Sequence, residues 1–119
     1  MEIKIEDKYV ILSSLNENLN ESNMLEISSM IEKTSKLGEK NFILNFSSVN
    51  SMTTEAMLEL KSIQKKIEKS KGTFVVFALN NNFENQFKKL KPGKMNVVPL
   101  QEEAIDIVFM EEIEREFNN

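Results

Sequence analysis

The chain alternates between short apolar runs and longer stretches with helical spacing. Residues 2–6 alternate with period two, residues 9–12 follow after a turn-like Asp-Lys pair, and residues 42–46 are rich in aromatic and branched side chains. Residues 73–79 form an unbroken apolar run of the kind that parallel sheets bury on both faces, and residues 95–98 form a last short run. These five runs are predicted to be strands, the first two as a hairpin.

Four further segments have the spacing of amphipathic helices. The first covers residues 20–37 and ends before Gly38, which is in a left-handed capping position. The second covers residues 53–70 and the last covers residues 100–116. Between them, a short third segment contains Phe83, Phe87 and Leu90 and stops at Lys91-Pro92-Gly93. Strands that alternate with helices imply right-handed βαβ crossovers. We therefore expect one α/β domain over residues 1–119, with a mostly parallel five-stranded sheet, an antiparallel N-terminal strand and about four helices.

Apolar residues keep a helical spacing along the first and the last helix. In the first helix these are Met24, Ile27, Ile31 and Leu37, with Met30 alongside. In the last helix Ile105, Val108, Phe109 and Ile113 can reach the core, whereas Ile107, Met110 and Phe117 cannot all do so. This apolar surplus near the C-terminal end hints at weak self-association, for example as a homodimer.

Charge and composition exclude several classes of function. The net charge of −4 and the pI near 5.0 argue against a nucleic-acid partner, because phosphate binding depends on clustered Lys and Arg. No stretch approaches the roughly 18 apolar residues of a membrane span, and the first residues lack the pattern of a signal peptide. We expect a cytoplasmic protein without membrane insertion, whose partner is a basic or neutral protein surface.

The chain contains neither cysteine nor histidine. Thiolate nucleophiles, zinc-thiolate sites and the commonest general base are therefore absent. No carboxylate pair occurs at a recognisable strand-end spacing, so an enzyme acting through acidic residues is the least favoured class. We expect no enzymatic activity, no cofactor and no metal.

Residues 42–58 carry the strongest functional signal. An apolar strand ends in a polar turn, and an amphipathic helix then starts at Thr53 and Thr54. Thr53 is predicted to cap the helix through its hydroxyl, with Met52 and Met57 as a hydrophobic staple. Thr54 is left without a structural role, so the chain delivers a free hydroxyl to a helix N-terminus.

The helical phase separates two faces of this segment. At about 100° per residue, Ala56, Leu60, Ile63 and Ile67 face the sheet, with Met57 at the margin. The opposite face carries Thr54, Leu58, Lys61, Lys65 and Lys69. The candidate hydroxyl is therefore expected on the solvent side, close to an exposed leucine that a partner protein can contact.

Here the chain resembles the STAS family, the sulfate-transporter and anti-sigma-factor-antagonist domains, whose hallmark is a buried strand followed by an Asp-Ser-Ser-Gly-like tetrapeptide that opens a helix. Thr53 stands at the Asp position, Thr54 at that of the regulatory phosphoacceptor, Glu55 at that of a small polar residue and Ala56 at that of Gly. The order of elements extends over nearly the whole chain, and residues 101–105 are typical of the family's last helix. The Gly-acid-Leu-Asp-like end of the second strand is replaced by residues 13–18.

The resemblance implies an anti-sigma factor antagonist that works by reversible protein binding. The unphosphorylated form would capture an anti-sigma factor with serine/threonine kinase activity, and phosphorylation at Thr54 would release it. The partner-binding surface would comprise Ser51, Thr53, Thr54, Glu55 and Leu58, with Lys61 and Asn80 at its edge. Constitutive binding without phosphorylation stays open, as does a structural or accessory subunit, such as a stressosome-type scaffold or a transport ATPase partner.

Two other features have simpler readings. Lys88, Lys89, Lys91 and Lys94 form a small basic cluster that could meet an anion but is more typical of a solvated face beside acidic neighbours. Residues 80–82, three asparagines in a row, could line a ligand site at a strand end or serve as turn and cap residues.

Overall fold

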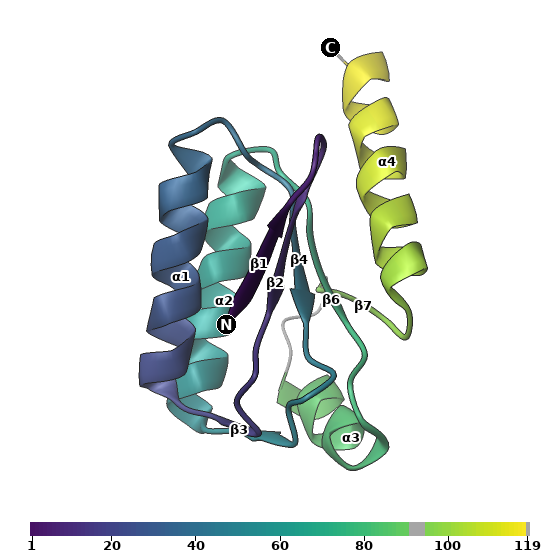
Figure 1. Ribbon diagram of the computed structural model, residues 1–119. Helices are drawn as coiled ribbons and strands as arrows, with labels where there is room; N and C mark the ends of the chain where they lie inside the picture. The colour runs from purple at the N-terminus through teal and green to yellow at the C-terminus, as the bar shows by residue number, and fades with distance from the viewer. Residues whose placement is uncertain (91–94, 119) are drawn as a thin grey trace.

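A computed structural model of the chain describes residues 1–90 and 95–118. Five strands form the main sheet in the order β1-β2-β4-β6-β7 (Figure 1): β1 (Glu2–Ile5), β2 (Val10–Ser13), β4 (Phe42–Asn45), β6 (Phe74–Phe77) and β7 (Asn96–Val98). β1 is antiparallel to β2, and every other neighbouring pair is parallel. The predicted mostly parallel sheet with an antiparallel N-terminal strand is confirmed. Two short strands, β3 (Asn18–Leu19) and β5 (Ser51–Met52), form a separate parallel pair.

Helices cover both faces of this sheet. Figure 1 shows α1 (Glu21–Ser35) and α2 (Thr54–Lys69) side by side on one face, and α4 (Gln101–Phe117) alone on the other. The short helix α3 (Asn81–Leu90) lies at the end of the sheet near β3. No helix in the described ranges is long and apolar enough to cross a membrane.

The strands are apolar on both sides because both sides are buried. Val10, Leu12, Phe42 and Leu44 belong to the main core beneath α1 and α2, together with Phe83 and Phe87 of α3. The alternate residues Ile11, Ile43, Val75 and Phe77 belong to a second core beneath α4. This alternation follows from the period of two along a strand, and it explains the unbroken apolar runs in the sequence.

Helix α1 begins and ends as its sequence predicts. Asn20 caps it, exchanging hydrogen bonds with Asn23. At the other end Gly38 has a φ of 103° and donates its N–H to the carbonyl of Ser35. Only glycine adopts that conformation without strain, so Gly38 ends the helix. Leu37 is exposed, because regular helix ends at Ser35 and the chain turns away.

The last helix has a different inner face from the one predicted. Ala104 and Val108 are fully buried, but Phe109 is 43% and Ile113 is 52% exposed, so the assignment of these two to the core was wrong. The side of α4 that continues the line of Ala104 and Val108 along the sheet carries Glu111, Glu112 and Arg115 instead. Polar contacts, rather than apolar spacing, decide how the second half of α4 is oriented.

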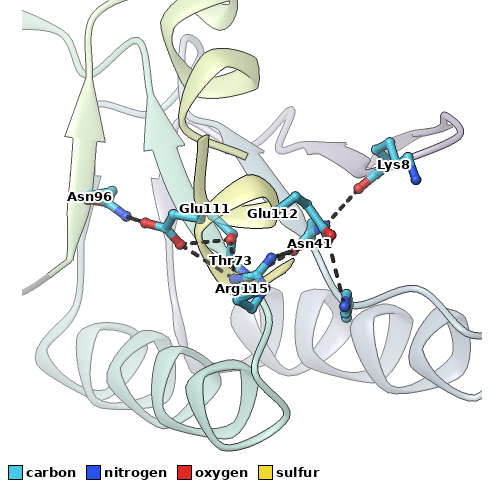
Figure 2. Close-up of polar contacts among 8 residues, drawn as sticks. Lys8, Asn41, Thr73, Asn96, Glu111, Glu112 and Arg115 are labelled. Atoms are coloured by element: carbon cyan, nitrogen blue, oxygen red, sulfur yellow. Dashed lines mark hydrogen bonds and ion pairs between the residues drawn. The ribbon is translucent and has the colours of Figure 1, made fainter. Parts of the chain in front are cut away.

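These polar contacts form a network between α4 and the starts of β4 and β6 (Figure 2). Asn41 Nδ2 donates to Glu112 Oε1 at 2.6 Å, and Thr73 Oγ1 donates to Glu111 Oε1 at 2.7 Å. Arg115 donates to Thr73 Oγ1 and to Asn41 Oδ1, both at 3.1 Å. Lys8, Lys40 and Asn96 join at its edges. The network stabilises the docked position of α4, although the buried Nε of Arg115 has no partner in the described part of the chain.

The end of α3 and the adjoining basic cluster are only partly described. Lys88 forms an ion pair with Glu84 at 2.9 Å, as expected of a solvated face balanced by acidic neighbours. The predicted stop at Lys91-Pro92-Gly93, and the cluster members Lys91 and Lys94, lie outside the described residues.

Candidate partner-binding site

A short pair of strands holds the chain that leads into α2. Thr53 N–H donates to the carbonyl of Leu19, and Asn50 N–H donates to the carbonyl of Glu17. The hydroxyl of Ser51 donates to the side-chain oxygen of Asn18 at 2.6 Å. The segment before the helix is therefore fixed to the loop after β2 by backbone and side-chain bonds, which sets the direction in which α2 starts.

The first turn of α2 shows different environments for the two threonines. Thr53 is the N-cap, and its Oγ1 accepts a hydrogen bond from the N–H of Ala56 at 3.1 Å. Met52 and Met57 on either side are buried in the main core, as the predicted staple requires. Thr54 is the first helical residue, its side chain is exposed, and no hydrogen bond of its hydroxyl occurs within the described residues. Capping thus accounts for Thr53 but not for Thr54.

The outer face of α2 continues from Thr54 along the helix. Glu55 is exposed, Leu58 is 60% exposed, and Lys61 is partly exposed. A shallow hollow of about 420 Å³ beside Leu58 is lined by Lys61, Ser62, Lys65, Lys66 and Lys69. The helical phase expected from sequence is confirmed, since Ala56, Leu60, Ile63 and Ile67 are buried. A protein of net charge −4 therefore presents a locally basic face with one large apolar side chain.

Asn80 and Ser51 lie at the side of this surface and have structural roles of their own. Asn80 Nδ2 donates to the carbonyl of Val49 at 2.9 Å and to Asn50 Oδ1. Its Oδ1 accepts from the N–H of Phe83 at 2.8 Å, which makes it the cap of α3. Of the two roles considered for residues 80–82, a ligand site or a helix cap, Asn80 has the role of a cap. Its bonds to Val49 and Asn50 also join α3 to the turn before Thr53. Ser51 is half-buried and hydrogen-bonded, so its hydroxyl is less available than that of Thr54.

The start of α2 combines an exposed hydroxyl with an exposed leucine and a row of lysines. A hydroxyl at the N-terminus of a 16-residue helix lies where the helix dipole favours an added anion. Within residues 1–90 and 95–118, no three Asp or Glu side chains gather closely enough to hold a metal ion. The arrangement can accept a phosphate and can contact a protein.

Two features away from Thr54 had no signal in the sequence. The Asn41–Arg115 network joins residues that are far apart in the chain, and it holds the pKa of Glu112 below its ordinary value of 4.5. The hydrogen bond from Asn41 is the main cause, and Arg115 and Lys40 add to it against the opposing effect of burial.

A cavity of about 460 Å³ lies between the C-terminal halves of α1 and α2. Its lining comes from several separate segments, so no local motif marks it.

Comparisons with known proteins identify the fold. No protein-family model matches the chain, and no curated protein is detectably similar in sequence. A Thermotoga maritima protein described as an anti-sigma factor antagonist superposes with a TM-score of 0.75 at 23% identity, over 90% of this chain and 92% of that one. The anti-sigma factor antagonist SpoIIAA of Bacillus gives a TM-score of 0.68 at 17% identity, over 90% and 96% of the two chains. A chain from the stressosome gives 0.69 at 11% identity, over 90% and 95%.

These similarities establish the class of fold. The five-stranded sheet, its antiparallel first strand and its four helices match those of the anti-sigma factor antagonists over about nine-tenths of the chain. The chain has the STAS, or SpoIIAA-like, fold. The resemblance carried by residues 42–58 is thereby confirmed at the level of the fold, while the roles of the individual site residues stay predictions.

Proposed function

We propose that this chain is a cytoplasmic regulatory binding protein of the anti-sigma factor antagonist type. It captures an anti-sigma factor with serine/threonine kinase activity through Ser51, Thr53, Thr54, Glu55 and Leu58, with Lys61 and Asn80 at the edge. Phosphorylation of Thr54 releases that partner. The observation that carries the proposal is the exposed hydroxyl of Thr54, which has no capping role and lies one helical turn from an exposed leucine.

Proteins of the same fold support this assignment. SpoIIAA is described as an anti-sigma factor antagonist, and its structure is known in an unphosphorylated and a phosphorylated form. Both forms superpose on this chain with a TM-score of 0.68. The fold of this chain therefore matches SpoIIAA in either state, which suits a switch that acts at an interface. The nucleotide in such a circuit belongs to the kinase, so this chain needs no cofactor of its own.

The charges around Thr54 favour switching by interface disruption. A phosphate there carries about −1.5 to −2 charges and gains some 0.3–1 kcal/mol from the helix dipole. Glu55 opposes it by a comparable amount at an exposed site. Because the two effects nearly cancel, phosphorylation changes folding stability little. At a closed interface the same phosphate meets desolvated groups of the partner, where charge repulsion and lost shape fit weaken binding.

The local charge also describes the partner's contact surface. Lys61, Lys65 and Lys69 continue the line of Thr54 and Leu58 along α2, so an acidic patch with an apolar recess for Leu58 fits this face. This replaces the expectation from net charge alone, which favoured a basic or neutral partner surface. The binding face differs in sign from the protein as a whole.

A second candidate is a structural or accessory subunit that binds without phosphorylation. The fold similarity extends to a stressosome chain, with a TM-score of 0.69, and to 18% of the length of an anion transporter of the solute carrier 26 family, with a TM-score of 0.72 at 13% identity. Glu55 and Ala56 also depart from the small polar residue and glycine that usually follow the phosphoacceptor. In this case the same face of α2 would bind a permanent neighbour.

Capture experiments with matched variants distinguish these functions. Immobilised wild-type protein, Thr54→Ala, Thr54→Glu and Leu58→Asp are exposed to native cytosol, and the bound proteins are identified. The proposed function predicts that wild type and Thr54→Ala retain a small ATPase of the histidine-kinase-like type, and that Thr54→Glu and Leu58→Asp lose it. Leu58→Asp should weaken binding by at least about 1–2 kcal/mol without unfolding the domain. Recovery of a transport ATPase or a large assembly, unaffected by Thr54→Glu, would support the second candidate instead.

A further inference from the structure

The edge strand β1 has no neighbour on its outer side within the described residues. It pairs only with β2, and all four of its residues are exposed. Ile3 is 39% and Ile5 is 56% exposed, and Met1 beside them is 40% exposed. An open edge strand offers a row of unpaired backbone groups to another chain, and here it also carries exposed apolar side chains between charged ones.

The hydrogen-bond pattern shows which backbone groups point outward. Glu6 N–H donates to the carbonyl of Tyr9 at 2.9 Å, and Glu6–Tyr9 continues the register of the β1–β2 ladder. Hydrogen-bonded and non-hydrogen-bonded pairs alternate in an antiparallel ladder. The backbone N–H and C=O groups of Glu2 and Lys4 therefore point toward β2, whereas those of Ile3 and Ile5 point to the open edge. Val10, opposite Ile5, donates its N–H to Asn41 on the other side, as this alternation requires.

The side chains of β1 are sorted between the two faces of the sheet. Ile3 lies opposite Leu12 and Ile5 opposite Val10, both of which belong to the main core beneath α1 and α2. Glu2 and Lys4 point to the other face. We propose that β1 pairs antiparallel with β1 of a second copy of this chain, so that the sheets of the two copies join across a two-fold axis at Ile3.

The charges select this register over its neighbours. With Ile3 opposite Ile3 of the second copy, Glu2 lies opposite Lys4 twice and Met1 opposite Ile5. A shift that centres the axis on Lys4 places Lys4 opposite itself and Glu2 opposite Glu6, which is repulsive. A shift that centres it on Ile5 keeps opposite charges in contact but sets Ile3 against Asp7. The register at Ile3 alone matches the apolar and the charged residues together.

The contact is small, so the dimer forms reversibly. Stable interfaces bury roughly 1,200–2,000 Å² in total, and one pair of four-residue strands provides less. Dimerisation is therefore expected to depend on protein concentration. It goes beyond the proposed function and uses a strand rather than the outer face of α2, so the two can fail separately.

Single-cysteine variants read the register directly, because the chain has no cysteine of its own. In the proposed register Ile3→Cys places two thiols across the axis, with Cα atoms about 5.5 Å apart, within the range of a disulfide. Lys4→Cys leaves the Cα atoms roughly 8 Å apart, which is too far. Mild oxidation at high protein concentration should cross-link Ile3→Cys into dimers and leave Lys4→Cys and Ile5→Cys monomeric. Cross-linking at residue 4 or 5 in place of residue 3 would overturn the register.

Sedimentation equilibrium of uncross-linked protein tests the contact itself. Glu2→Lys places like charges opposite each other twice and should weaken dimerisation at least about tenfold, and the exchange Glu2→Lys with Lys4→Glu should restore it. Ile3→Pro should abolish the dimer and leave the circular dichroism spectrum unchanged, because the lost N–H points away from β2. A wild-type protein that stays monomeric up to millimolar concentration would overturn the proposal. So would a dimer that survives Ile3→Pro, or one that cross-links through Ile113→Cys on α4.

Discussion

The two threonines at the start of α2 allow a test of the structure by single substitutions. Thr53→Ala removes the hydroxyl that accepts from Ala56 N–H at 3.1 Å. Thr54→Ala removes a neighbouring hydroxyl that makes no hydrogen bond within the described residues. The two changes delete the same atoms one residue apart, so each serves as the control for the other. Only the first should destabilise the fold.

The expected magnitude follows from the cap and from the size of the protein. Loss of a threonine N-cap costs about 0.5–2 kcal/mol, and the burial of Ala56 favours the upper half of that range because water reaches its N–H poorly. With roughly 2.1 cal/mol/K of unfolding entropy per residue over 119 residues, each kcal/mol lowers the midpoint by about 4 °C. Thr53→Ala should therefore lower Tm by about 5–8 °C. Thr54→Ala should leave Tm unchanged or slightly higher, because alanine has the better helix propensity.

Differential scanning calorimetry of wild type, Thr53→Ala, Thr53→Ser and Thr54→Ala measures these shifts. Thr53→Ser keeps the capping oxygen and should remain close to wild type. If Thr54→Ala lowers Tm and Thr53→Ala does not, the helix starts one residue later than described. Thr54 would then cap the helix, and its hydroxyl would not be free to accept a phosphate.

Three further changes test the core, a close backbone approach and the network under α4. Leu60→Ala, at a fully buried position, should cost about 2–5 kcal/mol of unfolding free energy in urea titrations, and a cost near zero would contradict the helical phase. Gly72→Ala should cost about 1–3 kcal/mol by the same assay, because the added Cβ would overlap the carbonyl oxygen of Lys40. Glu112→Gln should destabilise the protein at pH 7. Since the pKa of Glu112 is lowered in the folded state, its stabilisation is present above its ordinary value of 4.5 and is lost as pH falls through the folded value. The difference from wild type should shrink at lower pH, and a difference independent of pH would contradict the assignment.

The parts of the fold that could be predicted depend on local patterns. Unbroken apolar runs mark β4 and β6 because both faces of these strands are buried. The two faces of α2 follow from one period and one cap, Thr53, and both signals lie within a few residues of each other. Gly38 marks the end of α1 because its conformation excludes most other residues.

The orientation of α4 could not be predicted in the same way. Apolar residues occur on both sides of this helix, so spacing allowed Phe109 and Ile113 to face the sheet. The choice is made by Asn41 and Thr73, which come from distant parts of the chain and hydrogen-bond the polar side of α4. Asn80 is a comparable case, since its bonds to Val49 and Asn50 depend on the packing of α3 beside the turn. Long-range polar contacts of this kind leave no periodic pattern.

Phosphorylation by the captured kinase is the most direct test of the proposed role of Thr54 as a regulated phosphoacceptor on a binding surface. The captured kinase is purified, incubated with this protein and ATP, and the product is mapped by mass spectrometry of its peptides. We expect one added phosphate at Thr54, release of the kinase from the modified protein, and no labelling of Thr54→Ala. Labelling at Thr53 instead, or no labelling by a kinase shown to be bound and active, would contradict it.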